Sequence, residues 1–102
     1  MAVPYAIELN DQPTVVYRHA TAEQYADMLV DNFDEMLNHS EDRALVFSIS
    51  VHSFIMGQPF RLTHLRRALR HVMAQSEDIW LCRPRDIARH YMALPKEQQV
   101  GL

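Results

Sequence analysis

The sequence predicts an α/β fold in which about three parallel strands alternate with three helices. The central observation is the apolar run Leu45–Val51, which is rich in β-branched and aromatic residues and has the length of a strand covered on both faces. Helical periodicity precedes this run over residues 21–37 and follows it over residues 61–75. Because helical crossovers of a dozen or more residues join parallel strands, this order indicates an α/β layer structure.

Size and composition fit one globular domain spanning residues 1–102. Hydrophobic residues at 48% and charged residues at 23% are ordinary globular values. No apolar run approaches the roughly 18 to 20 residues of a membrane span, and the N-terminus lacks the basic and apolar regions of a signal peptide. Cys82 is the only cysteine, which excludes an internal disulfide and a cysteine-based zinc cluster. We therefore expect a cytoplasmic protein without a membrane partner.

The net charge of −3 hides an asymmetry between the two halves of the chain. Residues 1–60 carry two arginines against nine acidic residues, whereas residues 61–102 carry eight basic residues against four acidic ones. The basic half has no aromatic-interleaved basic strand or known reading helix, and the pI is about 6.0. We expect opposite charges to face each other or water across neighbouring helices, and no nucleic-acid partner.

The first helix has the clearest local signals. Residues 3–9 form an extended candidate that the turn residues 10–13 end, and residues 14–17 are either a strand or a connector. Thr21 then opens the helix with a capping box, because its hydroxyl can accept an early helix amide while Gln24 reaches back to the cap. One apolar stripe follows at steps of three and four residues: Ala22, Tyr25, Leu29, Phe33 and Met36.

The second half continues the alternation. The helix over residues 61–75 has the apolar stripe Leu62, Leu65, Leu69, Val72 and Met73. A short apolar run at residues 78–82 has strand length. The third helix begins near Pro84, where a missing amide proton costs nothing, and Pro95 ends it.

Two or three parallel strands make an incomplete sheet. Parallel strands need cover on both faces, and their edges need pairing. The sequence therefore predicts either a portion of a larger protein or a protomer whose sheet is completed by another chain.

His52 is the candidate functional residue of this predicted sheet. It stands where the central strand becomes a loop, and the carboxyl end of a parallel strand is where ligands bind in α/β sheets and barrels. Spacing alone leaves a second interpretation open, in which His52 is a structural residue hydrogen-bonded at a strand end.

The stretch Ser48–Arg61 combines this histidine with a following Gly-Gln-Pro-Phe-Arg, and it resembles the last conserved block of the polysaccharide deacetylase (NodB-homology) family. The nearest likeness is to the allantoinase-like, urate-catabolism branch. The flanks agree at Pro4–Tyr5, at Asn10–Asp11 and over residues 79–88, so the resemblance covers roughly residues 3–94.

This resemblance implies the C-terminal portion of a distorted (β/α) barrel that hydrolyses non-peptide C–N bonds. Family members remove acetyl groups from N-acetylated sugars or, in this branch, open cyclic ureides and related amides. The histidine of the block protonates the leaving nitrogen, a role that falls on His52 and suits a side chain that changes charge near neutral pH. Asn10 and Asp11 match the preceding block and are expected to bind and orient the substrate or to orient the histidine.

The blocks that carry the rest of the family's site have no counterpart in this sequence. Thr-Phe-Asp-Asp and His-x-x-x-His, which supply the base and the ligands of a divalent metal such as zinc, are both missing. The resemblance thus implies no metal or cofactor within this chain, a divalent metal held elsewhere in a complete barrel, and no turnover by the chain alone. The other histidines are expected at the surface: His19, His39, His64, His71 and His90.

Three functional hypotheses stay open. The chain is a C-terminal segment of a hydrolase that is inactive alone, or a half-enzyme completed by a partner chain that supplies metal or base residues. Both imply a small-molecule substrate, an N-acetyl sugar or a ureide, and association with the missing N-terminal half. The third hypothesis is a non-enzymatic α/β module that self-associates into a homo-oligomer.

Overall fold

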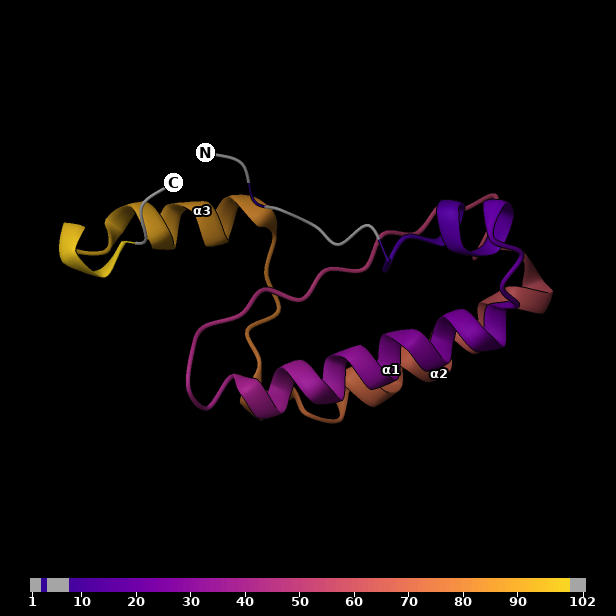
Figure 1. The fold of residues 1–102 in the computed structure, drawn as a ribbon, viewed down its shortest axis with the longest axis horizontal. Coiled ribbons are helices and arrows are strands. Elements are labelled where there is room, and N and C mark those ends of the chain that lie inside the picture. The colour runs from indigo at the N-terminus through magenta and orange to yellow at the C-terminus, as the bar shows by residue number, and fades with distance from the viewer. Residues whose placement is uncertain (1–2, 4–7, 100–102) are drawn as a thin grey trace. The chain divides into compact units, whose positions relative to one another are not determined.

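The computed structural model describes residue 3 and residues 8–99, and most of these lie in helices joined by extended connections (Figure 1). The chain divides into two compact units, Tyr5–Gln75 and a second built mainly from Ser76–Leu102. In chain order the elements are the π-helix η1 (Gln12–Tyr17), α1 (Ala22–His39), α2 (Pro59–Met73), the 3₁₀ turn η2 (Ser76–Asp78), α3 (Pro84–Ala93) and the 3₁₀ turn η3 (Lys96–Gln98).

The predicted α/β fold is wrong for the part of the chain that the structure describes. These residues contain no strand, so neither three parallel strands nor a partial (β/α) barrel is present among them. One isolated parallel bridge joins Asn10 to Ser50. Most of the predicted strand at residues 3–9 lies outside the described residues, and residues 14–17 are helical within η1.

The central apolar run is an extended connection that is only partly covered. Phe47 and Ile49, two residues apart, pack against the hydrophobic core. Val46 and Val51 are each 44% exposed. A parallel strand needs cover on both faces and a hydrogen-bonded neighbour, and a β-branched composition supplies neither. Because composition alone does not supply these two requirements, the prediction of a sheet from this run was wrong.

The predicted strand at residues 78–82 is also an exposed connection. Its first residue, Asp78, belongs to η2, and Trp80 and Leu81 are 60% and 74% exposed. The α3 helix that follows has no buried residue. The described residues of this second unit therefore have no hydrophobic core of their own.

All three predicted helices are confirmed. At α1 both arms of the capping box form, since Gln24 N–H donates to Thr21 Oγ1 at 3.0 Å and Thr21 N–H donates to Gln24 Oε1 at 2.8 Å. The α2 and α3 helices each begin at a proline, Pro59 and Pro84, where a helix has no use for the amide proton.

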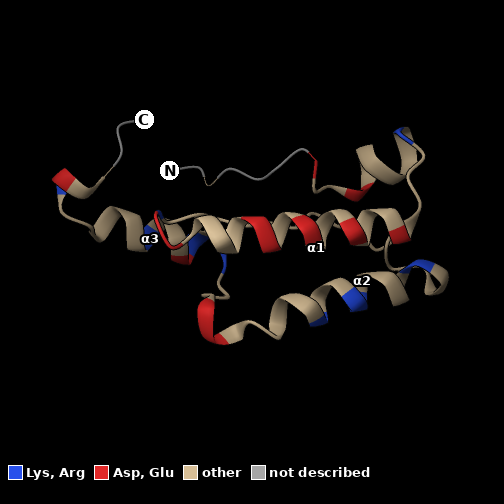
Figure 2. Ribbon diagram, turned by 60° about the horizontal axis from the view of Figure 1, so that its bottom comes forward, with Lys and Arg blue, Asp and Glu red and all other residues tan. Residues whose placement is uncertain are grey.

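The α1 and α2 helices pack side by side and run parallel (Figure 1). Arg67 Nη2 of α2 lies 2.8 Å from Asp27 Oδ1 of α1, and His71 Nε2 lies 2.6 Å from Asp34 Oδ1. Because both members of these pairs advance along their helices together, the two helices point the same way. Figure 2 shows acidic residues concentrated on α1 and basic residues on α2, in line with the expectation that opposite charges face each other or water. The pairs are about half exposed, so their contribution to stability is small.

The core lies between α1, α2, η1 and the turn that precedes α2. Its buried members are Leu9, Val15, Ala22, Tyr25, Ala26, Leu29, Ile55, Met56, Leu65 and Ala68. Ile55 and Met56 are 1% and 0% exposed, and their backbone N–H groups both donate to the carbonyl oxygen of His52, at 3.0 and 3.1 Å. The turn after His52 is thereby anchored in the core.

Gly57 closes this turn where there is no room for a side chain. A Cβ added to it would meet the backbone carbonyl of Ser53, which cannot move without moving the turn. We expect Gly57→Ala to lower the free energy of unfolding by about 1–3 kcal/mol, since overpacking against backbone forces a shift of main chain. Urea denaturation followed by circular dichroism measures this loss.

Ser53→Ala is the matched control, because it changes the same turn at an exposed side chain and leaves the backbone carbonyl in place. Equal midpoints for Gly57→Ala and Ser53→Ala would contradict the steric argument.

Candidate functional site

A buried carboxylate, that of Asp11, connects the start of η1 to the end of the central apolar run. Asp11 is 0% exposed. Its backbone N–H donates to Ser50 O at 3.1 Å, and Ser50 N–H donates to Leu9 O at 2.9 Å. These two bonds form the parallel bridge and place Asp11 beside the end of the central apolar run.

Both carboxylate oxygens of Asp11 bond to His52. Oδ1 lies 2.7 Å from His52 Nδ1, and Oδ2 accepts the His52 backbone N–H at 2.7 Å. A buried carboxylate is costly unless it is hydrogen-bonded, and here each oxygen has a donor. The bond to Oδ1 requires a proton on Nδ1, so it fixes both the orientation of the imidazole and its tautomer.

The other ring nitrogen of His52 faces no competing hydrogen bond. The His52 side chain is 36% exposed, and the described residues give Nε2 no partner. The Phe54 ring lies 5.3 Å from the imidazole, centroid to centroid, and is itself 62% exposed. An incoming group can therefore reach Nε2 beside an aromatic surface.

Tyr25 bonds to the backbone next to the Asp11–His52 pair. This tyrosine of α1 is 0% exposed, and its hydroxyl donates to Ser50 O at 3.0 Å, the same oxygen that accepts from Asp11. Burial of the phenol, and secondarily the negative charge of Asp11, raise the pKa of Tyr25. The hydroxyl therefore stays a neutral donor throughout the ordinary pH range.

The three residues that the sequence singled out lie together. Asp11 is fully buried and bonds to the histidine through both carboxylate oxygens. Asn10 Oδ1 accepts the Gln12 N–H at 3.1 Å, an Asx turn that opens η1. Substrate binding by Asn10 and Asp11, and proton transfer by His52, stay predictions.

Sequence reasoning missed the part that Tyr25 plays. It placed Tyr25 only in the apolar stripe of the first helix. The available signal was chemical, because a buried tyrosine hydroxyl usually has a hydrogen-bond partner. The partner is a carbonyl 25 residues away along the chain, which no local pattern indicates.

Within the described residues, no three or more His, Cys, Asp or Glu side chains gather as a group able to hold a metal ion. Asp11 directs both of its carboxylate oxygens to His52. The other histidines lie at or near the surface, as expected. His39 pairs with Glu35 at 2.8 Å and is 49% exposed, and His71 is 39% exposed in its pair with Asp34.

Comparison of the chain with protein-family models, with curated proteins and with solved structures found no match. The resemblance to the deacetylase block therefore stays a prediction. Among the helices of the described residues, none has both the length and the apolar character needed to cross a lipid bilayer.

The raised pKa of Tyr25 predicts a loss of stability in alkaline solution. The unfolded chain loses the phenol proton near the ordinary pKa of about 10, whereas the folded chain still holds it. The stabilising contribution of the Tyr25 phenol is thus fully present below pH 10. Above pH 10 the free energy of unfolding falls by up to about 1.4 kcal/mol per pH unit until the folded-state pKa is reached.

Urea denaturation between pH 8 and pH 11 tests this with Tyr25→Phe. The variant should be about 1 kcal/mol less stable at pH 8, where it lacks the bond to Ser50 O, and should lose less stability than the original chain above pH 10. Tyr17→Phe is the control, because Tyr17 is 67% exposed. Parallel pH profiles for the original chain and Tyr25→Phe would refute the assignment.

Proposed function

We propose that this chain is a segment of a hydrolase of non-peptide C–N bonds in which His52 is the general acid. The observation that carries the proposal is the two-point hydrogen bonding of His52 to the buried carboxylate of Asp11. A carboxylate behind Nδ1 holds the ring in one tautomer and stabilises its protonated form, leaving Nε2 for the reaction. The resemblance of Ser48–Arg61 to the deacetylase block supplies the reaction class.

The reaction uses the pair to move one proton. Water adds its oxygen to the carbonyl carbon of the substrate amide, and the C–N bond then breaks. The leaving nitrogen takes the proton from His52 Nε2. The proton on Nδ1 stays on the imidazole, hydrogen-bonded to Asp11. An N-acetyl sugar gives a carboxylic acid and an amine, and a cyclic ureide gives one ring-opened product that carries a carboxylic acid and a ureido group. The neutral imidazole regains a proton from solvent or from the attacking water.

Activation of the attacking water falls to groups outside this pair. The substrates proposed are an N-acetyl sugar or a cyclic ureide, both of which contain the required amide bond. Full turnover on either one then depends on association with a further segment that carries the base or a metal, and the isolated chain performs only the proton transfer.

An activated amide tests that proton transfer in the chain as it stands. p-Nitrotrifluoroacetanilide releases coloured p-nitroaniline, and its C–N cleavage responds to an acid that protonates the leaving nitrogen. We expect the purified chain to accelerate the release over an equal concentration of free imidazole. His52→Gln should lower the acceleration by about tenfold or more, short of the 10²- to 10⁴-fold effect of a general acid in a complete site.

Two further variants separate the pair from histidine in general. Asp11→Asn removes the charge behind Nδ1 and should lose most of the acceleration, whereas His64→Gln should retain it. Nitrogen-15 NMR of the imidazoles adds a readout of geometry, in which the Nδ1–H tautomer of His52 should disappear in Asp11→Asn. Full activity in His52→Gln would remove His52 from the mechanism.

A second candidate function, self-association, is favoured by the exposed apolar side chains. In the unit built mainly from Ser76–Leu102, Trp80, Leu81 and Met92 are 60%, 74% and 64% exposed, and α3 buries nothing. A segment without a core of its own needs apolar cover from elsewhere. A second copy of the chain is the simplest source, and association with a missing segment of the hydrolase is the other.

Light scattering at several protein concentrations distinguishes these sources. A homodimer of twice the 11.9 kDa chain mass is the expected result for self-association. Leu81→Ser together with Met92→Ser should return it to a monomer, while Tyr17→Ser, which changes an exposed apolar residue of the other unit, should not. A monomer at every concentration would exclude the homo-oligomer.

A further inference from the structure

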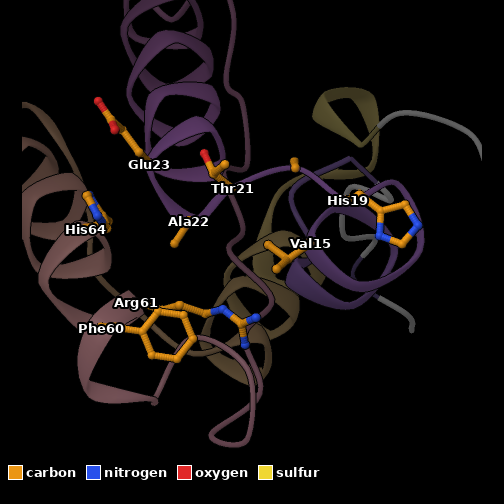
Figure 3. Close-up of a pocket in the computed structure, with 9 residues that line it drawn as sticks. Val15, His19, Thr21, Ala22, Glu23, Phe60, Arg61 and His64 are labelled. Carbon is orange, nitrogen blue, oxygen red and sulfur yellow. The ribbon is translucent and has the colours of Figure 1, made fainter.

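An open cavity of about 450 Å³ lies between the start of α1, η1 and the first turns of α2, all within the unit Tyr5–Gln75 (Figure 3). Its volume is in the range of small-molecule sites. Its apolar wall comes from Val15, Ala20, Ala22 and Phe60, and its polar residues are His19, Thr21, Glu23, Arg61 and His64. The Asp11–His52 pair does not line it.

Arg61 is the distinctive group of this cavity, because its guanidinium is largely unused. Its one hydrogen bond among the described residues runs from Nη1 to Ile55 O at 3.5 Å, and no carboxylate there pairs with it. An arginine offers five donors in a planar fork that fits a carboxylate at two points. Glu23, the acidic residue of the lining, is directed away from Arg61 in Figure 3.

Phe60 gives the cavity a flat apolar surface next to this charge. The Arg61 guanidinium carbon lies 4.7 Å from the centroid of the Phe60 ring, so the ring holds the arginine in place through a cation–π contact. The Phe60 ring is nevertheless 68% exposed, which leaves room for a second flat group against it. Figure 3 shows both side chains projecting from α2 toward the side of Val15.

We propose that this cavity binds a small organic anion with a planar apolar body, of the aromatic carboxylate class. The carboxylate bonds to the Arg61 fork, and the body of the ligand lies against Phe60 and the apolar wall near Val15. His19 and His64 also line the cavity, so its basic residues outnumber the single Glu23. The proposal does not rest on the proton-transfer role of His52, because the two sites share no side chain.

Titration of the ¹⁵N-labelled chain with benzoate, followed by amide NMR shifts, tests the proposal. Benzoate should bind saturably with a Kd of about 1–10 mM, the range open to so small a ligand. The shifts should concentrate at residues 21–23 and 60–64. Benzamide, which has the same shape without the charge, should bind about tenfold more weakly or worse.

Arg61→Gln and Arg66→Gln form the matched pair of variants. Both remove one positive charge from α2, but Arg66 is exposed and does not line the cavity. Arg61→Gln should weaken benzoate about 10- to 100-fold, as loss of a charge-assisted hydrogen bond does, and Arg66→Gln should leave it within about twofold. Equal effects of the two variants, or equal binding of benzamide and benzoate, would overturn the proposal.

Phe60→Leu keeps the test decisive should Arg61→Gln fail to fold. This variant should weaken the binding of benzoate. The much weaker binding of inorganic phosphate should be unchanged, because phosphate has no planar body to place against the ring. Phosphate that binds as tightly as benzoate and shifts the same amides would refute the requirement for an aromatic body.

Discussion

The described fold of the larger unit depends on one requirement, that the buried carboxylate of Asp11 be given enough hydrogen bonds. A charge with no exposure to water is tolerated only when donors surround it. His52 supplies two donors, one from its ring and one from its backbone. The segment before η1 and the turn before α2, 41 residues apart in the chain, are thereby held at a fixed separation.

Ser50 transmits this constraint to the helices. Its carbonyl oxygen accepts from Asp11 and from Tyr25, so the position of α1 and the position of the pair are set by the same atom. On the other side of His52, Ile55 and Met56 fix the turn in the core, and Gly57 lets that turn close tightly. The candidate site is therefore supported from α1 and from the core, although one face of the histidine meets solvent.

The helices were predicted correctly from the sequence and the parallel sheet was predicted wrongly, for a physical reason. The capping box at Thr21, the apolar stripe of α1 and the prolines at the starts of α2 and α3 are local signals, complete within a few residues. A sheet depends on neighbours far along the chain, and the run Leu45–Val51 carries no information on whether they exist. The meeting of Asp11 with His52 is equally non-local, and it was indicated only as an option of the family resemblance, not by any spacing.

The order of the elements has a consequence for how the chain folds. Because α1 and α2 run parallel, the chain must travel back along its own length between them, and the Asp11–His52 bonds close a loop of 41 residues. Bringing the ends of such a loop together costs about 3 kcal/mol of chain entropy beyond a constant term. The ion pair between Arg67 of α2 and Asp27 of α1 joins residues 40 apart, so packing of the two helices requires the same closure as the Asp11–His52 pair. Both sets of contacts are non-local, which favours slow folding and makes the environment of His52 an indicator that the whole unit has assembled.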